Sequence, residues 1–193
     1  MKTQIQWKTY WENQLEPGDH AELAEFFRNT YGAVGAWNVK HFKGSRSWAG
    51  ARPELRIIGH DERGVAAHFG VLRRFIRLGA IDQLVAEVGL YAVRPDLQRS
   101  GIGYQSGINV MIPTLLDLKV PFGFGTVRHE LREHVEKASA ALMIVSGVLV
   151  RSTNLWDKSK TCIEDLLVLV IPLERAVDEW PAGELIDRNG PEL

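Results

Sequence analysis

The chain has 193 residues, of which 45% are hydrophobic and 24% charged, so it is long enough for one globular domain with a sizeable core. Its 23 basic and 24 acidic residues give a net charge of −1, which argues against a general electrostatic grip on nucleic acid or on an anionic membrane. The single cysteine, Cys162, excludes an internal disulfide and argues against a cysteine-based zinc site. Because the first residues are polar and no apolar run approaches the ~20 residues that span a bilayer, we expect a cytoplasmic protein.

The first quarter of the chain predicts a strand, a helix and a long irregular loop. Residues 3–11 alternate apolar and polar side chains, which favours a strand. Asp19 follows a proline-glycine turn and is a suitable N-cap for a helix that runs through about residue 29. Residues 31–53 are rich in glycine, aromatic and basic residues without a sustained period, so they predict an ordered loop with room for a short helix.

Side chains in this loop make it a candidate surface for a sugar. Tryptophan offers a flat apolar face to the CH face of a sugar ring, and arginine donates hydrogen bonds to its hydroxyl groups. The candidates are Trp37, Arg46, Trp48 and Arg52. The alternative is that each tryptophan only anchors the loop to the core, and for each one taken singly the sequence favours that alternative.

Three strands are predicted in the middle of the chain. Residues 54–60 and 65–78 alternate on either side of a glycine-containing turn and predict a β-hairpin. His68 lies in the second strand, where a lone histidine is more often a satisfied core residue than a catalyst, so it is a minor candidate. The next strand, from about residue 82, contains the apolar run Leu84–Val93 with a single carboxylate at Glu87.

The turn after this strand has the composition of an anion-binding site. Its residues are Gln98, Arg99, Ser100, Gly101, Ile102 and Gly103, and apolar residues at helical spacing follow. Backbone N–H groups at the start of a helix, together with the helix dipole, form a cradle that suits a phosphate. The alternative is a turn that needs small residues for packing.

The second half of the chain predicts two helices, three strands and a tail. The helix after the turn should kink or stop at Pro113. We expect a strand at 120–127, a helix at 129–138, strands at 140–151 and 162–173, and a surface tail. This order implies a single domain over residues 1–193 of the α/β (α+β) class, with a mixed sheet flanked by helices on both faces.

Residues 86–103 resemble the acyl-CoA-binding core of the GNAT-type N-acyltransferase superfamily. The hallmark of that superfamily is a Gln/Arg-x-x-Gly-x-Gly/Ala turn after a strand, which residues 98–103 match. The predicted order of elements also agrees with the superfamily. The resemblance implies a GNAT-like mixed, mostly antiparallel sheet and an acyltransferase activity.

Longer segments resemble the nodulation protein A family of symbiotic bacteria. They are GSRSWAGARPE, RGVAAHFGVLRRFI, LYAVRPDL, PFGFGTVR and EWPAGELIDRNGPEL. This resemblance implies transfer of a fatty acyl chain to the free amine of the non-reducing glucosamine of a chitin oligosaccharide, in lipo-chitooligosaccharide (Nod factor) biosynthesis. The implied donor is an acyl carrier protein thioester or acyl-CoA. No tightly bound cofactor, metal or nucleic acid is implied, and peripheral contact with a membrane stays open. Residues 137–149 lack the glycine-and-aromatic pattern expected there.

Acyl transfer to an amine needs a neutral amine, an oriented thioester carbonyl and a stabilised oxyanion. Glu87 is the first candidate for the base, since burial in an apolar strand disfavours the charged form of a carboxylate. The resemblance supports this choice, because superfamily members carry their catalytic glutamate on this strand. The alternative is a structural glutamate paired with Arg73 or Arg74.

The resemblance assigns the remaining roles. Backbone N–H groups of Tyr91, Ala92 and Val93 would contact the oxyanion and the pantetheine, and residues 98–103 would hold the phosphate of the phosphopantetheine. Candidates to protonate the leaving thiolate are Tyr104, His129 and His134; candidates to meet an acidic carrier protein are Arg94, Arg99 and Arg128. All of these helix histidines and surface arginines have the alternative of being merely solvated.

Two other function classes remain open. One is an acyl-CoA-dependent N-acetyltransferase that acts on a small-molecule or protein amine. The other is a non-enzymatic regulator that binds acyl-CoA. Use of acetyl-CoA alone, with no activity on long acyl-carrier thioesters, would favour the first of these over the fatty acyltransferase.

Overall fold

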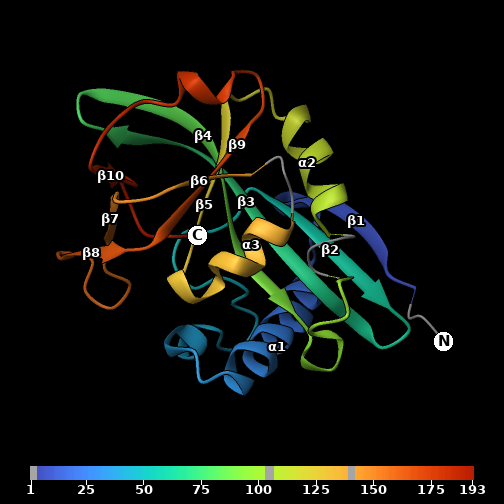
Figure 1. The fold of residues 1–193 in the computed structure, drawn as a ribbon. Helices are drawn as coiled ribbons and strands as arrows, with labels where there is room; N and C mark the ends of the chain where they lie inside the picture. Colours follow the sequence, from blue (N-terminus) through green and yellow to red (C-terminus); the bar gives the residue numbers. More distant parts are fainter. Residues whose placement is uncertain (1–3, 103–106, 139–141) are drawn as a thin grey trace. The chain divides into compact units, whose positions relative to one another are not determined.

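The computed structural model describes residues 4–102, 107–138 and 142–193 (Figure 1). Within those ranges it has three α-helices and ten β-strands. The chain forms two compact units. The first holds the residues through Val71 together with Leu90–Ile112 and Leu193, and the second holds Leu72–Gly89 and Pro113–Glu192. Among the described residues no helix is both long and apolar enough to cross a membrane.

The first unit contains an antiparallel arrangement of three strands. They are β1 (Gln6–Trp11), β2 (Leu55–Asp61) and the first half of β3 (Gly64–Leu78). The β2–β3 pairing closes where Asp61 faces Gly64, with an irregularity in register at Gly59 and His60. The hairpin predicted from alternating side chains is therefore confirmed.

Helix α1 (Pro17–Ala33) begins before the predicted position. Pro17 takes the first helical position, where its missing N–H costs nothing because that donor has no partner within the helix. Asp19, predicted as the N-cap, lies inside the first turn, and its carboxylate accepts a hydrogen bond from the Glu16 N–H at 2.8 Å. The predicted N-cap was therefore wrong. Leu23 and Phe27 of this helix are buried.

The loop after α1 is ordered and held against that helix (Figure 1). It contains one short 3-10 helix, η2 (Trp37–His41), as the sequence allowed. The Arg28 guanidinium donates to the Phe42 carbonyl at 2.9 Å, and the fully buried Phe42 ring stacks on Phe27 with centroids 4.9 Å apart. The loop thus shares the aromatic core of α1.

Strand β4 (Ile81–Val93) and helix α2 (Gly107–Asp117) contribute to both units. Leu90 in β4 has a φ of 47°, which lies in the left-handed region. Helix α2 continues past Pro113 to Asp117, so this proline does not end the helix.

The second unit contains a sheet in the order β6-β9-β5-β4-β3-β10-β7-β8. The strands not yet introduced are β5 (Phe122–Val127), β6 (Met143–Val145), β7 (Leu149–Thr153), β8 (Thr161–Asp165), β9 (Leu167–Pro172) and β10 (Leu185–Asp187). Helix α3 (Arg132–Ala138) follows β5. The β4–β5 and β10–β7 pairs are parallel, whereas β5–β9, β6–β9, β7–β8 and β3–β10 are antiparallel. The predicted mixed, mostly antiparallel sheet is confirmed.

Three predictions in the second half of the chain were wrong in detail. The strand predicted at 140–151 is two strands, β6 and β7, because Gly147 adopts a φ of 74° between them. The strand predicted at 162–173 is also two, since β8 pairs with β7 while β9 pairs with β5 and β6. The tail predicted to lie on the surface forms β10 between β3 and β7, with Ile186 fully buried.

Candidate functional site

Glu87 lies in the part of β4 that belongs to the second unit and is only 2% exposed. Its Oε1 accepts a hydrogen bond from Arg188 Nε at 2.9 Å, and its Oε2 accepts one from Arg74 Nη1 at 2.7 Å. The burial expected for Glu87 is present, and so is the pairing with Arg74 that was its alternative. The second partner, Arg188, was not anticipated.

Arg188 organises the polar cluster around Glu87. It is 2% exposed, and its Nη1 and Nη2 donate to the hydroxyl oxygens of Ser152 and Thr126, each at 2.6 Å. All three guanidinium nitrogens therefore have an acceptor. We call Arg74, Glu87, Thr126, Ser152 and Arg188 the Arg188 cluster.

A second carboxyl group belongs to the electrostatic surroundings of Glu87. Burial raises the pKa of Glu192; the charge of Arg188 opposes this shift, and the charges of Glu164 and Glu87 add to it. The residue before it, Pro191, accepts a hydrogen bond from Arg74 Nη1 at 2.8 Å. Sequence reasoning missed Glu192 because nothing in the turn-rich tail signalled burial.

The ladder between β4 and β5 is short and ends at Glu87. It comprises three residue pairs, the last of which joins Glu87 and Phe124. On β5, a Cβ atom at Gly125 would come within 3.3 Å of the Val88 carbonyl oxygen. Gly125 thus lies close against the backbone of β4.

The candidate donor-binding residues belong to the first unit. Tyr91, Ala92 and Val93 end β4 directly after the left-handed Leu90. The Tyr91 carbonyl accepts a hydrogen bond from the Tyr31 hydroxyl at 3.0 Å, and the Val93 carbonyl accepts one from the Gln98 amide at 3.1 Å. Side chains from other segments therefore hold the end of this strand.

The turn after β4 has two residues in the left-handed region, Arg99 at a φ of 63° and Gly101 at 84°. Turns with such residues form backbone concavities that bind anions. Gln98, Arg99 and Ser100 are exposed, and the Ile102 N–H contacts the Ser100 hydroxyl at 3.4 Å. Gly103 and Tyr104 lie outside the described residues.

Three of the four candidate sugar-binding residues lie together. The guanidinium carbons of Arg52 and Arg46 are 4.7 Å and 5.7 Å from the centroid of the half-buried Trp48 ring. Arg46 also donates to the Trp48 and Ala49 carbonyls at 3.1 Å and 2.9 Å. Trp37 begins η2, and its side chain is outside what the structure describes.

The candidate proton donors and carrier-protein contacts among the described residues are either exposed or paired within the chain. His129 and His134 are exposed, and His129 Nε2 lies 2.9 Å from the Asp165 carboxylate. Arg99 and Arg128 are exposed as well. Arg94, in contrast, donates to the carboxylates of both Asp61 and Asp96, so its charge is neutralised within the chain.

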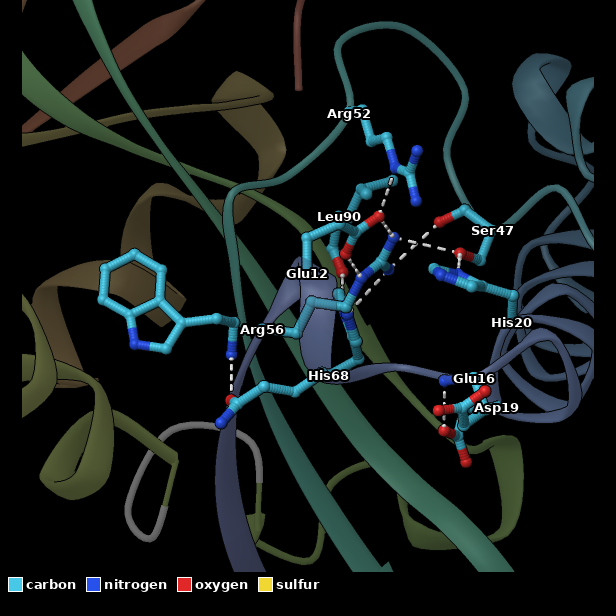
Figure 2. A network of polar contacts seen from close by, with 11 residues as sticks. Glu12, Glu16, Asp19, His20, Ser47, Arg52, Arg56, His68 and Leu90 are labelled. Carbon is cyan, nitrogen blue, oxygen red and sulfur yellow. Dashed lines mark hydrogen bonds and ion pairs between the residues drawn. The ribbon is translucent and has the colours of Figure 1, made fainter.

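A second buried arginine organises a cluster in the first unit (Figure 2). Arg56 is fully buried; its Nε donates to Glu12 Oε2 at 2.6 Å, and its Nη2 donates to the Ser47 hydroxyl at 3.0 Å. Arg52 donates to Glu12 Oε1 at 2.6 Å. We call Glu12, Ser47, Arg52, Arg56 and His68 the Arg56 cluster. Because residues 54–60 alternate, Arg56 falls on the polar side of the predicted strand, and no feature of the sequence indicated its burial.

Electrostatics in the Arg56 cluster favour an ionised Glu12 and a neutral His68. Burial opposes ionisation of Glu12, but hydrogen bonds from Arg56 and Arg52 outweigh it, so the pKa of Glu12 lies below its usual value. Burial, with the charge of Arg56 adding to it, lowers the pKa of His68 well below its usual range. His68, a minor catalytic candidate from the sequence, lies in the core with both ring nitrogens in polar contacts.

Comparisons with known proteins bear on family and fold. The model of the nodulation protein A (NodA) family matches residues 2–193. Nodulation protein A of Bradyrhizobium sp. (strain ANU 289) is 57% identical over 198 residues, covering 100% of this chain and 93% of the relative. Nodulation protein A of Rhizobium tropici is 54% identical over 198 residues, covering 100% of both. Among solved structures, the GNAT family N-acetyltransferase YhbS of Escherichia coli, in complex with CoA, has a TM-score of 0.61 at 12% identity, covering 97% of this chain and 91% of that one. This last likeness concerns the fold alone.

Proposed function

The chain belongs to the nodulation protein A family, and from that premise we propose that it transfers a fatty acyl chain from an acyl carrier protein thioester to the free amine of the non-reducing glucosamine of a chitin oligosaccharide. Family and fold together identify an N-acyltransferase of Nod factor synthesis. The observation that carries the finer proposal is the family match over residues 2–193.

The reaction is a direct attack of the amine on the thioester. The nitrogen lone pair forms a C–N bond with the carbonyl carbon, and the carbonyl electrons move onto oxygen to give a tetrahedral oxyanion. The oxyanion then collapses, the C–S bond breaks, and sulfur leaves with the bonding electrons. The nitrogen loses one proton to a base and the thiolate gains one, so the exchange is balanced.

Glu87 is the proposed base. Support comes from its burial on β4 and from the free capacity of its carboxylate, which has about four lone-pair sites. Among the described residues each oxygen accepts one hydrogen bond from an arginine, so a second lone-pair site on each oxygen is available for a proton or a water. The competing role, a glutamate that only balances Arg74 and Arg188, uses the same contacts, so the two roles must be separated by kinetics.

The proposed donor site lies along the end of β4 and the turn that follows. Backbone N–H groups of residues 91–93 contact the oxyanion and the pantetheine, which extends the sheet like an added strand. Residues 98–103 hold the phosphate. The exposed Gln98–Ser100 segment and the left-handed Gly101 support this role, since a phosphate must reach the backbone closely.

The remaining roles complete the proposal. Tyr104, His129 and His134 are the candidate donors of a proton to the leaving thiolate. The acceptor sugar is assigned to Trp37, Arg46, Trp48 and Arg52, and the grouping of the last three supports this assignment. For contact with an acidic carrier protein, exposed Arg99 and Arg128 are better suited than Arg94, whose charge Asp61 and Asp96 already neutralise.

Mass spectrometry of the reaction product tests the proposal. The purified chain is mixed with a de-N-acetylated chitin tetramer or pentamer and, in parallel, with long-chain acyl-carrier thioesters, long-chain acyl-CoA and acetyl-CoA. The proposal predicts one fatty acyl group on the terminal amine from the acyl-carrier thioester. Acetylation from acetyl-CoA, with no product from any long acyl-carrier thioester, would replace the proposal with an acyl-CoA-dependent N-acetyltransferase.

A further inference from the structure

Leu90 is the point in β4 where the backbone leaves the extended conformation. Its φ of 47° places a non-glycine residue in the left-handed region within a strand. Such a residue is energetically unfavourable and persists only where its surroundings impose it. Strained residues of this kind are concentrated at functional sites, so what imposes this one is informative.

Two side chains from different elements hold two consecutive carbonyl groups at this point. His68, on β3, contacts the Leu90 carbonyl through Nδ1 at 2.9 Å. Tyr31, on α1, donates its hydroxyl to the Tyr91 carbonyl at 3.0 Å. We call His68 and Tyr31 the carbonyl clamp. The two residues are also linked through Phe27, whose ring stacks on Tyr31 and meets the His68 ring edge-on.

The contacts of His68 allow one neutral tautomer. A carbonyl oxygen only accepts hydrogen bonds, so Nδ1 must carry the proton that reaches Leu90. Arg56 Nη1 lies 3.3 Å from Nε2 and only donates, so Nε2 must be the acceptor. A protonated imidazole would direct a second N–H at the arginine. The Arg56 cluster therefore sets the direction in which His68 donates (Figure 2).

Arg56 is itself fixed in position. Its nitrogens contact Glu12, Ser47 and His68, and it has no exposed surface. Ser47 in turn receives a contact from His20 Nδ1 at 2.9 Å. A chain of hydrogen bonds thus runs from the Glu12 carboxylate through Arg56 and His68 to the backbone of β4.

We infer that His68 and Tyr31 are positioning residues for acyl transfer: they hold the Leu90 and Tyr91 carbonyls and so orient the N–H groups of the strand end toward the thioester. This inference rests on the proposed function of residues 91–93. Neither side chain need touch substrate. Their effect on the reaction comes from geometry, because a backbone donor displaced by about 1 Å can cost a factor of about 10² in rate.

Paired variants at position 68 test the inference. His68→Phe keeps a ring against Phe27 but removes the donor, whereas His68→Asn keeps an amide donor near the place of Nδ1. The kcat is measured under multiple-turnover conditions with a saturating acyl-carrier thioester, at equal folded fraction. We expect His68→Phe to lower kcat by about 10- to 100-fold, with the donor Kd changed less than about threefold. We expect the kcat of His68→Asn to be about tenfold or more above that of His68→Phe.

Tyr31→Phe provides a second test that does not disturb the buried charges. It removes one hydroxyl and keeps the stacked ring, and we expect kcat to fall by about three- to tenfold with an unchanged acceptor KM. If His68→Phe does not fold, this variant decides alone. Equal rates for His68→Phe and His68→Asn, or a Tyr31→Phe kcat within twofold of wild type, would overturn the inference.

The wild-type control separates this inference from the proposed function. A wild-type protein that transfers no acyl chain from any donor overturns both. An active wild type whose clamp variants keep their full kcat overturns the positioning role alone.

Discussion

Two buried arginines bind the same kinds of partner but position different parts of the molecule. Arg56 and Arg188 are 0% and 2% exposed, and each is held by a glutamate and a serine hydroxyl. Each glutamate also binds a second arginine, Arg52 in one unit and Arg74 in the other. The two clusters differ in what lies at their other end.

The third described hydrogen bond of Arg188 goes to the hydroxyl of Thr126, and its guanidinium carbon lies 5.7 Å from the centroid of the Phe124 ring. Its described hydrogen bonds therefore all end on side chains within the Arg188 cluster. Arg56 instead contacts His68, and His68 contacts the Leu90 backbone. Arg188 therefore positions the Glu87 carboxylate, whereas Arg56, through His68, positions the backbone of β4 at Leu90. The role of a buried ion pair thus depends on which groups its remaining hydrogen bonds hold.

The largest expected effect comes from removing each arginine in turn. Arg188→Met leaves the buried Glu87, and Arg56→Met the half-buried Glu12, without its main donor, and each change also removes the donor to a buried serine hydroxyl. We expect each to lower the free energy of unfolding by about 3–5 kcal/mol. Chemical denaturation with matched m-values measures both.

Arg77→Met is the control, because Arg77 and its partner Asp82 are exposed and such pairs contribute little. If Arg188→Met lowered the free energy of unfolding by less than about 1 kcal/mol, the Arg188 cluster would not contribute to stability as a buried ion pair.

A substitution at Gly101, which lies outside both clusters, tests donor binding without disturbing either buried arginine. Gly101 has a φ of 84°, which side chains rarely adopt, and the proposed phosphate must approach its backbone. We expect Gly101→Val to weaken donor binding at least tenfold. Direct binding of the acyl-carrier thioester measures this. Normal donor affinity in a folded variant would remove the turn from the donor site.

The elements with strong local patterns were predictable, whereas those that depend on distant partners were not. The 54–78 hairpin alternates and carries its own turn, so its sequence sufficed. Strand β10 has only three residues, and it pairs with β3 and β7, which lie far from it in the sequence. Its own residues therefore gave no sufficient pattern. The same holds for the candidate site: Glu87 stood out as one charge in an apolar run, but Arg188 lay in a tail whose composition indicated a surface.

A smaller effect is expected where the Arg56 cluster reaches the surface. Arg52 joins Glu12 to the half-buried Trp48 ring. Trp48→Ala removes the ring and should raise the oligosaccharide KM by up to about tenfold, since contact with an aromatic ring is worth about 0.5–1.5 kcal/mol. The donor Kd should stay within about twofold. A larger change in donor than in acceptor affinity would assign this loop to the donor side.

The smallest expected effect is on the pH dependence of stability. Burial lowers the pKa of His68 in the folded chain, so below pH ~6.5 the unfolded chain binds a proton that the folded chain does not. Stability therefore falls as the pH drops from ~6.5, by at most about 1.4 kcal/mol per pH unit for this group.

His68→Asn should flatten this decline between pH ~6.5 and ~5, as measured by denaturation at several pH values. His20 and His41, whose pKa values burial also lowers, contribute a residual slope in both proteins. Equal slopes in wild type and variant would contradict a neutral buried His68.

The proposed difference in function between the two clusters is tested most directly at their glutamates, Glu87 and Glu12. Glu87→Gln and Glu12→Gln each remove the negative charge shared by two arginines, so both should lose comparable stability. The decisive measurement is the pH–rate profile of acyl transfer for both variants at equal folded fraction. We predict that Glu87→Gln lowers kcat by about 10²-fold or more and loses the limb of the profile that reports the base, while Glu12→Gln keeps the wild-type shape. A profile of unchanged shape in Glu87→Gln, with a rate no lower than that of Glu12→Gln, would show that Glu87 only balances its arginines.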